Sequence, residues 1–591
     1  MRKIMHIAAV LTTAISITTY AGQPGLRTAG SDLVERAAAI QNYETGIAAW
    51  MWTDKVWYGF TEKITLRYSV KNNGEWYPFT LVAYLQNNQT GAKTYFPQFT
   101  AQTTDIFGNA PGTFKPVLVE NTERSVLLGE NGQLGGALDA PDEPGMHTLV
   151  MEFRDVNGLR ILKTLYAKFA VVSGIEDIRG NIESDRRLTN DKLYRINGTV
   201  FVRNGATLTI DPGTVIIGQP GSEPPSVLVI TRSGKIRAEG TRSRPIIMTS
   251  ALPFGDRKRG DWGGLILLGR APVNVDGGEF AIEGLPATED SKYGGNDPDH
   301  DCGALRYVRV EYAGSIFAPN NEANSFTWGG CGRKTVAEYL QATYGLDDSF
   351  EWFGGTMNAR YLIGGLGADD YLDWQLGYTG NIQFGFFYQD ADNPGNRGIE
   401  ADNSEYNQGA SPLSKPQVFN VTFIGSGVQG FDESNAPGIY LRRGTGGSVN
   451  NAIVTRFFSS GLHIDGSATE AQIDNGNITM NGILLWNNNI GGNGAPTIDG
   501  QVRSGASTAF AKGERGQGKQ FLVADPMLQR PFEFNDPDFR PMPESPAFRA
   551  NWVQPPDNGF FDQSARFLGA AGEAKWWEEW TNFVTDKAIK P

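Results

Sequence analysis

The chain has 591 residues, a formal net charge of −13 and a pI near 5.0. This length exceeds that of a typical single domain, so two or three domains are expected. The acidic balance argues against nucleic acid as a partner and is compatible with cation binding. The 73 glycines, 31 prolines and 11% aromatic residues favour an all-β protein with many tight turns.

Residues 1–21 are predicted to be a secretory signal peptide. Arg2 and Lys3 precede a short apolar stretch, and Thr19 and Ala21 supply the small residues that a signal peptidase reads. This stretch is too short for a membrane span, and no later segment reaches the ~18 to 20 apolar residues that a span requires. We therefore expect an exported protein that is not transmembrane, located in the periplasm, on the outer surface or outside the cell.

Residues 22–175 are predicted to form a short helix and a small β-sandwich. The helix is expected over residues 31–41, where Asp32 and Glu35 form a capping-box pattern. The remaining segments alternate polar and apolar residues between Gly/Asn turns, which is typical of antiparallel strands. These segments are residues 63–70, 80–85, 148–153 and 164–171.

Residues 176–524 are predicted to form a solenoid of short strands. The strands are three to five residues long, they end at sharp Gly, Asn or Pro corners, and no helix-length pattern separates them. Strands joined by turns in this way cannot form a βαβ sheet and must wind directly into coils. Asn at the corners, as at Asn420 and Asn451, tolerates left-handed backbone geometry.

A repeat lies at the centre of this region, between Tyr344 and Trp374. The segment Asp347-Asp348-Ser-Phe-Glu351-Trp352 is followed 22 residues later by Asp369-Asp370-Tyr-Leu-Asp373-Trp374. A period of this length is the mark of stacked turns. The repeat therefore predicts ladders of carboxylates and indoles about 4.8 Å apart.

Three segments near the start of the solenoid resemble a known family. They are Gly205-Ala-Thr-Leu-Thr-Ile-Asp-Pro-Gly-Thr214, Gly234-Lys-Ile-Arg-Ala-Glu-Gly-Thr241 and Pro245-Ile-Ile-Met-Thr-Ser250. They are similar to secreted bacterial right-handed parallel β-helix proteins of the pectate-lyase-like superfamily, over roughly residues 190 to 500. The resemblance implies a right-handed parallel β-helix. It implies no single activity, because that superfamily contains lyases, hydrolases, esterases, adhesins and proteins without catalysis.

Residues 525–591 are predicted to be a C-terminal cap. Trp576, Trp577, Trp580 and Phe583 form an aromatic cluster, and a solenoid needs a cover over its open end. The alternative is an aromatic platform for a carbohydrate.

The two cysteines, Cys302 and Cys331, are predicted to form a disulfide, as an isolated pair in an exported protein usually does.

The stacked acids allow three interpretations, because carboxylates ~5 Å apart repel unless a cation, hydrogen-bond donors or raised pKa values relieve them. They could bind Ca²⁺, for which oxygen ligands from adjacent turns are suitable. They could be the catalytic pair of a glycosidase. They could also be structural and cap turn amides. The Ca²⁺ candidates are Asp348, Glu351, Asp370, Asp373 and Glu400, and the catalytic candidates are Asp347, Asp348, Asp369 and Asp370.

The resemblance also gives motifs with which to compare these acids. Polygalacturonase-type enzymes of this fold use an Asp-Asp pair, a Gly-His-Gly and an Arg-x-Lys. This chain matches only the Asp-Asp pair, since it has Gly461-Leu-His463 and Arg442-Arg-Gly444 in place of the other two. Pectate lyases pair Ca²⁺-binding acids with a basic residue, for which Arg360, Arg397, Arg442 and Arg443 are the candidates.

We therefore expect an exported cell-envelope or secreted β-helix protein that binds a polysaccharide or another cell-surface polymer through an acidic and aromatic face. Trp352, Trp374, Arg360 and Arg397 are the expected polymer contacts. The alternatives are a polysaccharide lyase or glycoside hydrolase that uses the same acids, and a purely structural surface or adhesion protein. The sequence does not decide between an enzyme and a binding protein, and it does not give the oligomeric state.

Overall fold

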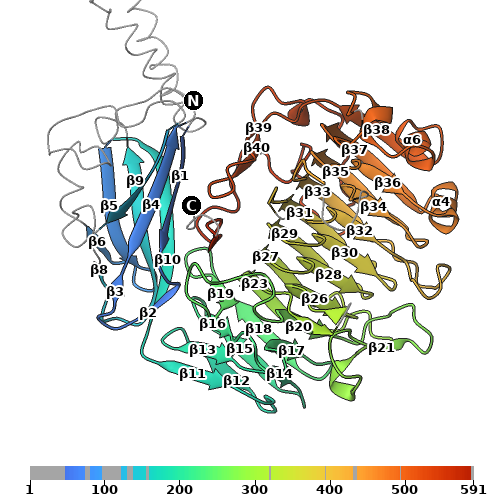
Figure 1. Cartoon of the computed structure of the whole chain (residues 1–591). Coiled ribbons are helices and arrows are strands. Elements are labelled where there is room, and N and C mark those ends of the chain that lie inside the picture. The colour runs from blue at the N-terminus through green and yellow to red at the C-terminus, as the bar shows by residue number, and fades with distance from the viewer. Residues whose placement is uncertain are drawn as a thin grey trace, which may run out of the picture.

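The protein is described by a computed structural model (Figure 1), which covers residues 47–72, 80–95, 122–128, 138–154, 159–318, 321–392, 395–429, 436–492 and 494–586. The predicted signal peptide (1–21) and the predicted helix (31–41) lie outside the described residues. Within the part that is described, no helix is both long enough and apolar enough to cross a membrane.

The N-terminal part forms a small β-sandwich, as predicted. A three-stranded antiparallel sheet, in the order β1-β4-β7, packs against a five-stranded sheet, in the order β2-β10-β9-β5-β6. Side chains from both sheets, including Met51, Leu149 and Phe169, form its core. The strands are β1 (Ile47–Thr53), β2 (Trp57–Gly59), β4 (Leu66–Asn72), β5 (Thr80–Asn87), β6 (Lys93–Tyr95), β7 (Thr122–Leu128), β9 (Gly145–Arg154) and β10 (Ile161–Val172), with a small pair of β3 (Lys63–Ile64) and β8 (Leu138–Asp139).

The second part is a parallel β-helix, as predicted, whose coils rise from β11 to β38 in Figure 1. Its longer sheet contains β11 (Ile175–Ile178), β12 (Arg186–Leu188), β13 (Leu193–Ile196), β15 (Thr207–Ile210), β16 (Val215–Gly218), β18 (Lys235–Glu239), β19 (Ile246–Ser250), β23 (Gly303–Glu311), β27 (Val336–Thr343), β29 (Asn358–Gly365), β31 (Asn381–Tyr388), β33 (Gln417–Ile424), β35 (Gly447–Thr455), β37 (Ile478–Trp486) and β38 (Gln517–Val523). Its second sheet contains β14 (Thr199–Val202), β17 (Val227–Ile230), β20 (Leu265–Leu268), β26 (Phe326–Gly329), β28 (Phe350–Phe353), β30 (Leu372–Gln375), β32 (Ile399–Ala401), β34 (Ile439–Leu441) and β36 (Leu462–Ile464).

A sharp corner divides each long strand of the larger sheet. The first half of β23 pairs with β18 and the second half with β19, and Tyr307 between the two halves has φ 49°. The same corner is left-handed at Asn420 and Asn451, with φ 55° and 54°, as predicted for asparagine. Tyr339 stacks on Tyr307 with ring centroids 4.4 Å apart, so aromatic stacking supports the corner in coils that lack asparagine.

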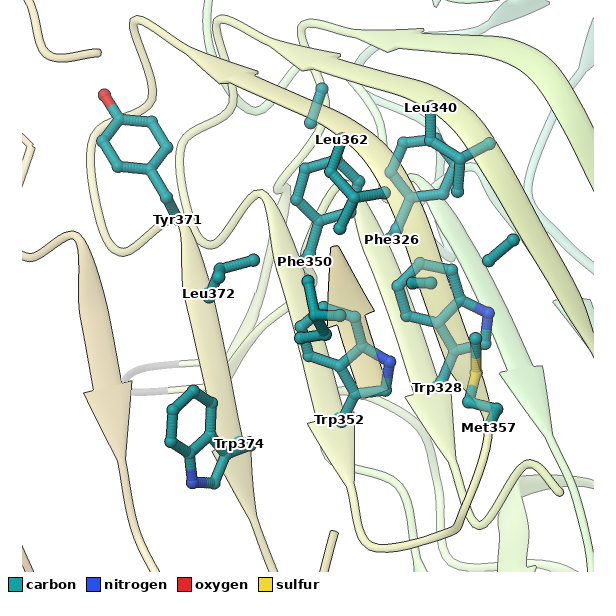
Figure 2. Close-up of a cluster of buried hydrophobic side chains, with 14 of the residues drawn as sticks. Phe326, Trp328, Leu340, Phe350, Trp352, Met357, Leu362, Tyr371, Leu372 and Trp374 are labelled. Atoms are coloured by element: carbon teal, nitrogen blue, oxygen red, sulfur yellow. The ribbon is translucent and has the colours of Figure 1, made fainter. Parts of the chain in front are cut away.

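The interior of the β-helix is filled by ladders of large side chains (Figure 2). Alternate residues of β26, β28 and β30 point inward, because successive side chains of a strand face opposite ways. Trp328 and Trp352 stack with ring centroids 5.2 Å apart, and Tyr378 continues this stack beyond Trp352 at 5.2 Å. The indole of Trp374 leaves the stack, since its Nε1 donates to the Thr445 hydroxyl at 3.2 Å.

The C-terminal aromatic cluster is buried against the β-helix, but its position differs from the prediction. Short helices cover the last coils, and Phe510 and Ile473 of these helices join the interior core. The chain from residue 525 onward instead runs back along the outer face of the larger sheet, where Trp577 packs on Phe386 and Trp580 on Tyr307. The elements involved are α4 (Ser467–Asp474), α5 (Ile498–Gln501) and α6 (Ala506–Ala511), and then β39 (Leu528–Arg530) and β40 (Asp538–Pro541) in the tail.

This C-terminal tail lies between the sandwich and the β-helix (Figure 1). On the sandwich side, the backbone N–H of Ala49 donates to Asp536, which also pairs with Lys163. On the solenoid side, Asp586 pairs with Arg257 at 2.5 Å. The tail therefore joins the two parts.

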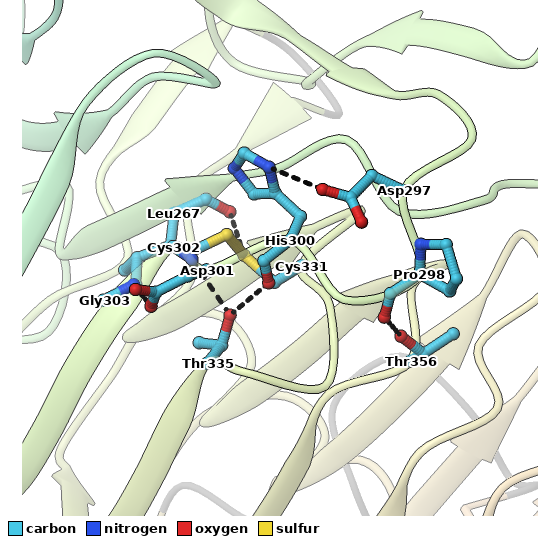
Figure 3. Close-up of a disulfide and its surroundings, with 10 residues drawn as sticks. All are labelled: Leu267, Asp297, Pro298, His300, Asp301, Cys302, Gly303, Cys331, Thr335 and Thr356. Atoms are coloured by element: carbon cyan, nitrogen blue, oxygen red, sulfur yellow. Dashed lines mark hydrogen bonds and ion pairs between the residues drawn. A yellow bond between two sulfur atoms is a disulfide. The ribbon is translucent and has the colours of Figure 1, made fainter. Parts of the chain in front are cut away.

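The predicted disulfide between Cys302 and Cys331 is present (Figure 3). It connects the start of β23 to the residue two positions after β26. Thr335 Oγ1 accepts the Cys302 N–H and donates to the His300 carbonyl, which fixes the same turn.

Candidate acidic cation site

The predicted carboxylate ladder is confirmed on the second sheet. Parallel pairing places Glu351 of β28 opposite Asp373 of β30, and Asp373 opposite Glu400 of β32. The ladder begins one coil earlier, at Thr327 of β26, which lies opposite Glu351. This coil was not predicted, although Asn324-Ser-Phe-Thr-Trp328 is a third copy of the motif Asp348-Ser-Phe-Glu-Trp352.

The turn acids form a second ladder that joins successive coils through backbone amides. Asn324 Oδ1 accepts the N–H of Asp348 at 3.1 Å, and Asp348 Oδ1 accepts the N–H of Asp370 at 3.0 Å. Asp370 Oδ1 then accepts the N–H of Arg397 at 2.5 Å. One oxygen of Asp348 and one of Asp370 therefore have the structural, amide-capping role that was one of the three interpretations.

The two ladders bring carboxylates together in groups whose oxygens lie within 4.8 Å of one another. The first two groups span the same two coils, those of β28 and β30, and the third spans the coils of β30 and β32. Together the three overlapping groups form an acidic strip, in which the second is called the middle group, and they contain every acid that the sequence marked as a Ca²⁺ or catalytic candidate. The first is Asp347, Asp348 and Asp369, the second is Asp348, Glu351 and Asp373, and the third is Asp370, Asp373 and Glu400.

The middle group contains a carboxylate oxygen with no partner. Asp373 is 8% exposed, and its buried Oδ1 has no hydrogen-bond donor among the described residues. Glu351 is positioned by two amides, since Asn324 Nδ2 and Gln375 Nε2 donate to its two oxygens. In the described part of the chain, no lysine or arginine forms an ion pair with any member of this group.

The third group differs because arginines neutralise it. Arg397 pairs with Asp370 at 3.2 Å and with Glu400, and Arg442 pairs with Glu400 and with Asp402. Positive charge therefore lies at one end of the acidic strip. It reaches the middle group only as the charge of Arg442 acting on Asp373, without an ion pair among the described residues.

Burial and mutual repulsion act together on the middle group. Burial raises the pKa values of Asp348, Glu351 and Asp373 well above the ordinary range, and neighbouring carboxylates raise them further. The charge of Glu283 adds to the repulsion that raises the pKa of Glu351. Glu283 lies in a long excursion from the coils, residues 269–302 between β20 and β23, and nothing in the sequence indicated that it approaches the stacked acids. The excursion contains the hairpin of β21 (Glu279–Ala281) and β22 (Lys292–Gly294) and covers the outer face of the second sheet.

Two of the predicted polymer contacts are wrong. Trp352 and Trp374 are 0% and 1% exposed and point into the coil, as Figure 2 shows. The reason is the period of a strand: when Glu351 faces outward, its neighbour Trp352 faces inward. No sugar can stack on either indole.

The two predicted arginine contacts have different positions. Arg397 lies within the acidic strip, but it is buried and paired with carboxylates. Arg360 belongs to β29 of the other sheet, where it pairs with Glu338 at 2.6 Å and is not part of the acidic groups.

The exposed aromatic residues beside the strip come from segments outside the coils, Phe280 from the β21 strand and Tyr406 from the loop after β32. Phe280 and Tyr406 are 41% and 67% exposed, and their ring centroids lie 5.9 Å apart. Tyr293 connects them to the ladder, since it contacts Phe280 and Phe353, and the Glu351 charge acts on it. No sequence periodicity could mark these residues, because they lie outside the coils.

The family model for the pectate-lyase-like β-helix domain matches residues 180–521. The chain belongs to this family. No curated protein and no solved structure matches the chain. The family membership agrees with the resemblance of residues 205–250 and accounts for the fold. The acidic strip is the feature of the coils that points to an activity.

Proposed function

We propose that the exported protein binds Ca²⁺ at Asp348, Glu351 and Asp373 and uses the ion to hold an anionic polysaccharide. The observation that carries this proposal is the buried Asp373 Oδ1. It has no hydrogen-bond donor among the residues that the structure describes, and carboxylate oxygens of Glu351 and Asp348 lie within 4.8 Å in the same group. A buried, unpaired carboxylate is costly, and a bound cation relieves that cost.

The chemistry of the donors favours Ca²⁺ over transition metals. The middle group offers only carboxylate oxygens, with no histidine or cysteine among the described members of any acidic group. Three carboxylates supply up to six oxygens, and water or a ligand can complete the six- to eight-coordinate shell that Ca²⁺ prefers. The amides that position Glu351 keep its oxygens in place before the ion arrives.

The surroundings favour an extended acidic polymer as the partner. Asp347 and Asp369 are only half-buried, so the strip reaches solvent at the turn. The middle group shares Asp348 with the group of this turn, so a Ca²⁺ ion in the middle group can bridge protein carboxylates to those of a uronate chain that approaches from the turn. Phe280 and Tyr406 beside the strip offer ring faces on which a sugar can stack.

The test is polymer binding with and without calcium. Immobilised polygalacturonate and alginate should retain the protein in CaCl₂ and release it in EGTA, while neutral dextran should not retain it. Tyr406→Ala should weaken retention about 10-fold, whereas Tyr95→Ala, an exposed tyrosine of the sandwich, should not change it. Equal retention on acidic and neutral polymers, or retention in EGTA, would contradict the proposal.

A polysaccharide lyase or hydrolase is the second candidate function. It is favoured by the first acidic group, in which oxygens of Asp347, Asp348 and Asp369 lie within 4.8 Å, close to the ~5 to 5.5 Å of retaining glycosidases. Release of unsaturated or reducing sugar ends from the same polymers tests this. Turnover that disappears in Asp369→Asn would establish catalysis, and unchanged turnover in this variant would remove the first group from the reaction.

A further inference from the structure

A pocket of about 480 Å³ lies between the C-terminal tail and the turns that follow β35 and β37. It is separate from the acidic strip, since Arg456 lies two coils beyond Glu400, which is roughly 10 Å along the axis. Its volume falls in the range of small-molecule sites. Its lining includes Arg456, Trp486, Asp525, Phe532 and Met542.

Arg456 is the cationic residue among those that line this pocket, and it has no carboxylate partner in the described part of the chain. Its Nη2 donates to the Ser426 carbonyl at 3.3 Å, and its guanidinium lies 4.3 Å from the centroid of the Phe532 ring. Its Nε is buried without a hydrogen-bond acceptor among the described residues. Asp525 also lines the pocket, but it accepts the N–H of Met527 at 2.8 Å and forms no ion pair with Arg456.

This arrangement differs from that of three arginines that pair with carboxylates. Arg257 pairs with Asp586, Arg309 with Glu311, and Arg442 with Glu400 and Asp402. Burial lowers the pKa of the Arg456 guanidinium, whereas carboxylates raise the pKa of Arg442 although burial opposes them. A half-buried guanidinium without an anion is costly, and a bound anion removes that cost.

We propose that this pocket binds a small monocarboxylate with an apolar body. Arg456 would receive the carboxylate, for which its planar fork of N–H donors is suited. Trp486, Phe532 and Met542 would surround the apolar part. The lining is mainly apolar, so a sugar acid would leave most of its hydroxyl groups without partners.

The first experiment is calorimetric titration of the full chain with N-acetyl-L-phenylalanine and with its neutral amide, in EGTA. The acid should bind and the amide should bind at least about 10-fold more weakly, because only the acid carries the charge. EGTA separates this site from the proposed Ca²⁺ site. Equal binding of acid and amide, no binding of the acid, or stronger binding of D-glucuronate would overturn the proposal.

Variants locate the binding site. Arg456→Gln should weaken binding of the acid at least about 10-fold. Arg456→Lys should weaken it less, because the lysine ammonium keeps the positive charge but lacks the paired N–H donors of the guanidinium. Phe532→Ala should also weaken binding and leaves the charge in place, which covers the case in which Arg456→Gln fails to fold. Arg515→Gln is the matched control, since Arg515 pairs with Glu470 and Asp474 outside the pocket. Unchanged affinity in folded Arg456→Gln would refute the site.

Two further ligands identify the source of the carboxylate. 3-Phenylpropionate represents a free acid, and the tripeptide Gly-Gly-Phe represents a peptide C-terminus. Tighter binding of one supports the carboxylate site and identifies its natural form, while failure of both to compete with N-acetyl-L-phenylalanine would contradict a shared site.

Discussion

Asp348 Oδ1 accepts the backbone N–H of Asp370, the residue in the same position one coil later, at 3.0 Å. This bond explains how acidic side chains can be stacked in a stable coil. One oxygen of Asp348 and one of Asp370 accept a backbone N–H of the following coil, so these two acids stabilise the turns in which they lie. The strip is therefore both a structural feature and a candidate site, and substitutions have to separate the two roles.

Asp373→Asn should separate them, because Asp373 Oδ1 has no donor in the described structure. We expect the calcium-free variant to melt at or above the wild-type temperature, since a buried charge is removed. At a Ca²⁺ concentration of about 100 times Kd, the free energy of unfolding of the wild type should rise by roughly 2.7 kcal/mol. The free energy of unfolding of the variant should rise much less. Differential scanning calorimetry with EGTA and with CaCl₂ measures both effects. Asp499→Asn, at an exposed ion pair with Lys512, is the control; a calcium response that survives in Asp373→Asn would exclude this group.

The melting temperature should fall more steeply with rising pH without calcium than with it. The pKa values of Asp348, Glu351 and Asp373 are raised in the folded protein, so their contribution to stability is complete below their unfolded values and is lost as pH rises through the folded values. The melting temperature in EGTA should therefore fall as the pH rises above about 4, the ordinary pKa of these groups, and the increment from CaCl₂ should grow over the same range. An increment that shrinks with rising pH would be incompatible with carboxylate ligands.

Trp352→Ala should destabilise the β-helix by about 3 to 5 kcal/mol, because it removes a fully buried indole from the Trp328–Trp352–Tyr378 stack. Tyr406→Ala should leave stability within about 0.5 kcal/mol, since this ring is 67% exposed. Guanidinium unfolding followed by circular dichroism compares the two. A stable Trp352→Ala with reduced polymer binding would reverse the assignment of this residue to the interior.

Asp586→Asn should loosen the C-terminal tail. The Asp586 carboxylate accepts the N–H groups of Gly255 and Arg257, pairs with the Arg257 guanidinium and contacts the Tyr312 hydroxyl at 3.0 Å. Loss of the charge leaves Arg257 buried and unpaired, which costs about 3 to 5 kcal/mol. Limited proteolysis should then cleave the tail faster than in wild type. Asp557→Asn, at an exposed tail position, should match the wild type, and equal cleavage in both variants would show that Asp586 does not hold the tail.

The sequence by itself determined the coils and their register. The 22-residue repeat placed Glu351 against Asp373, because parallel strands of equal coils can align in only one way. The sequence also predicted the β-sandwich before the coils, the disulfide and the acidic strip.

The tertiary structure decided which of these residues can meet a ligand. Strand alternation turned Trp352 and Trp374 inward, and the path of the excursions brought Glu283, Phe280 and Tyr406 to the strip. The tail from residue 525 packs along the side of the coils because the outer face of the larger sheet is apolar there, and the tail shields it from water. Contacts of this kind join residues far apart in the chain, and they depend on where loops lead, which a periodic pattern does not encode.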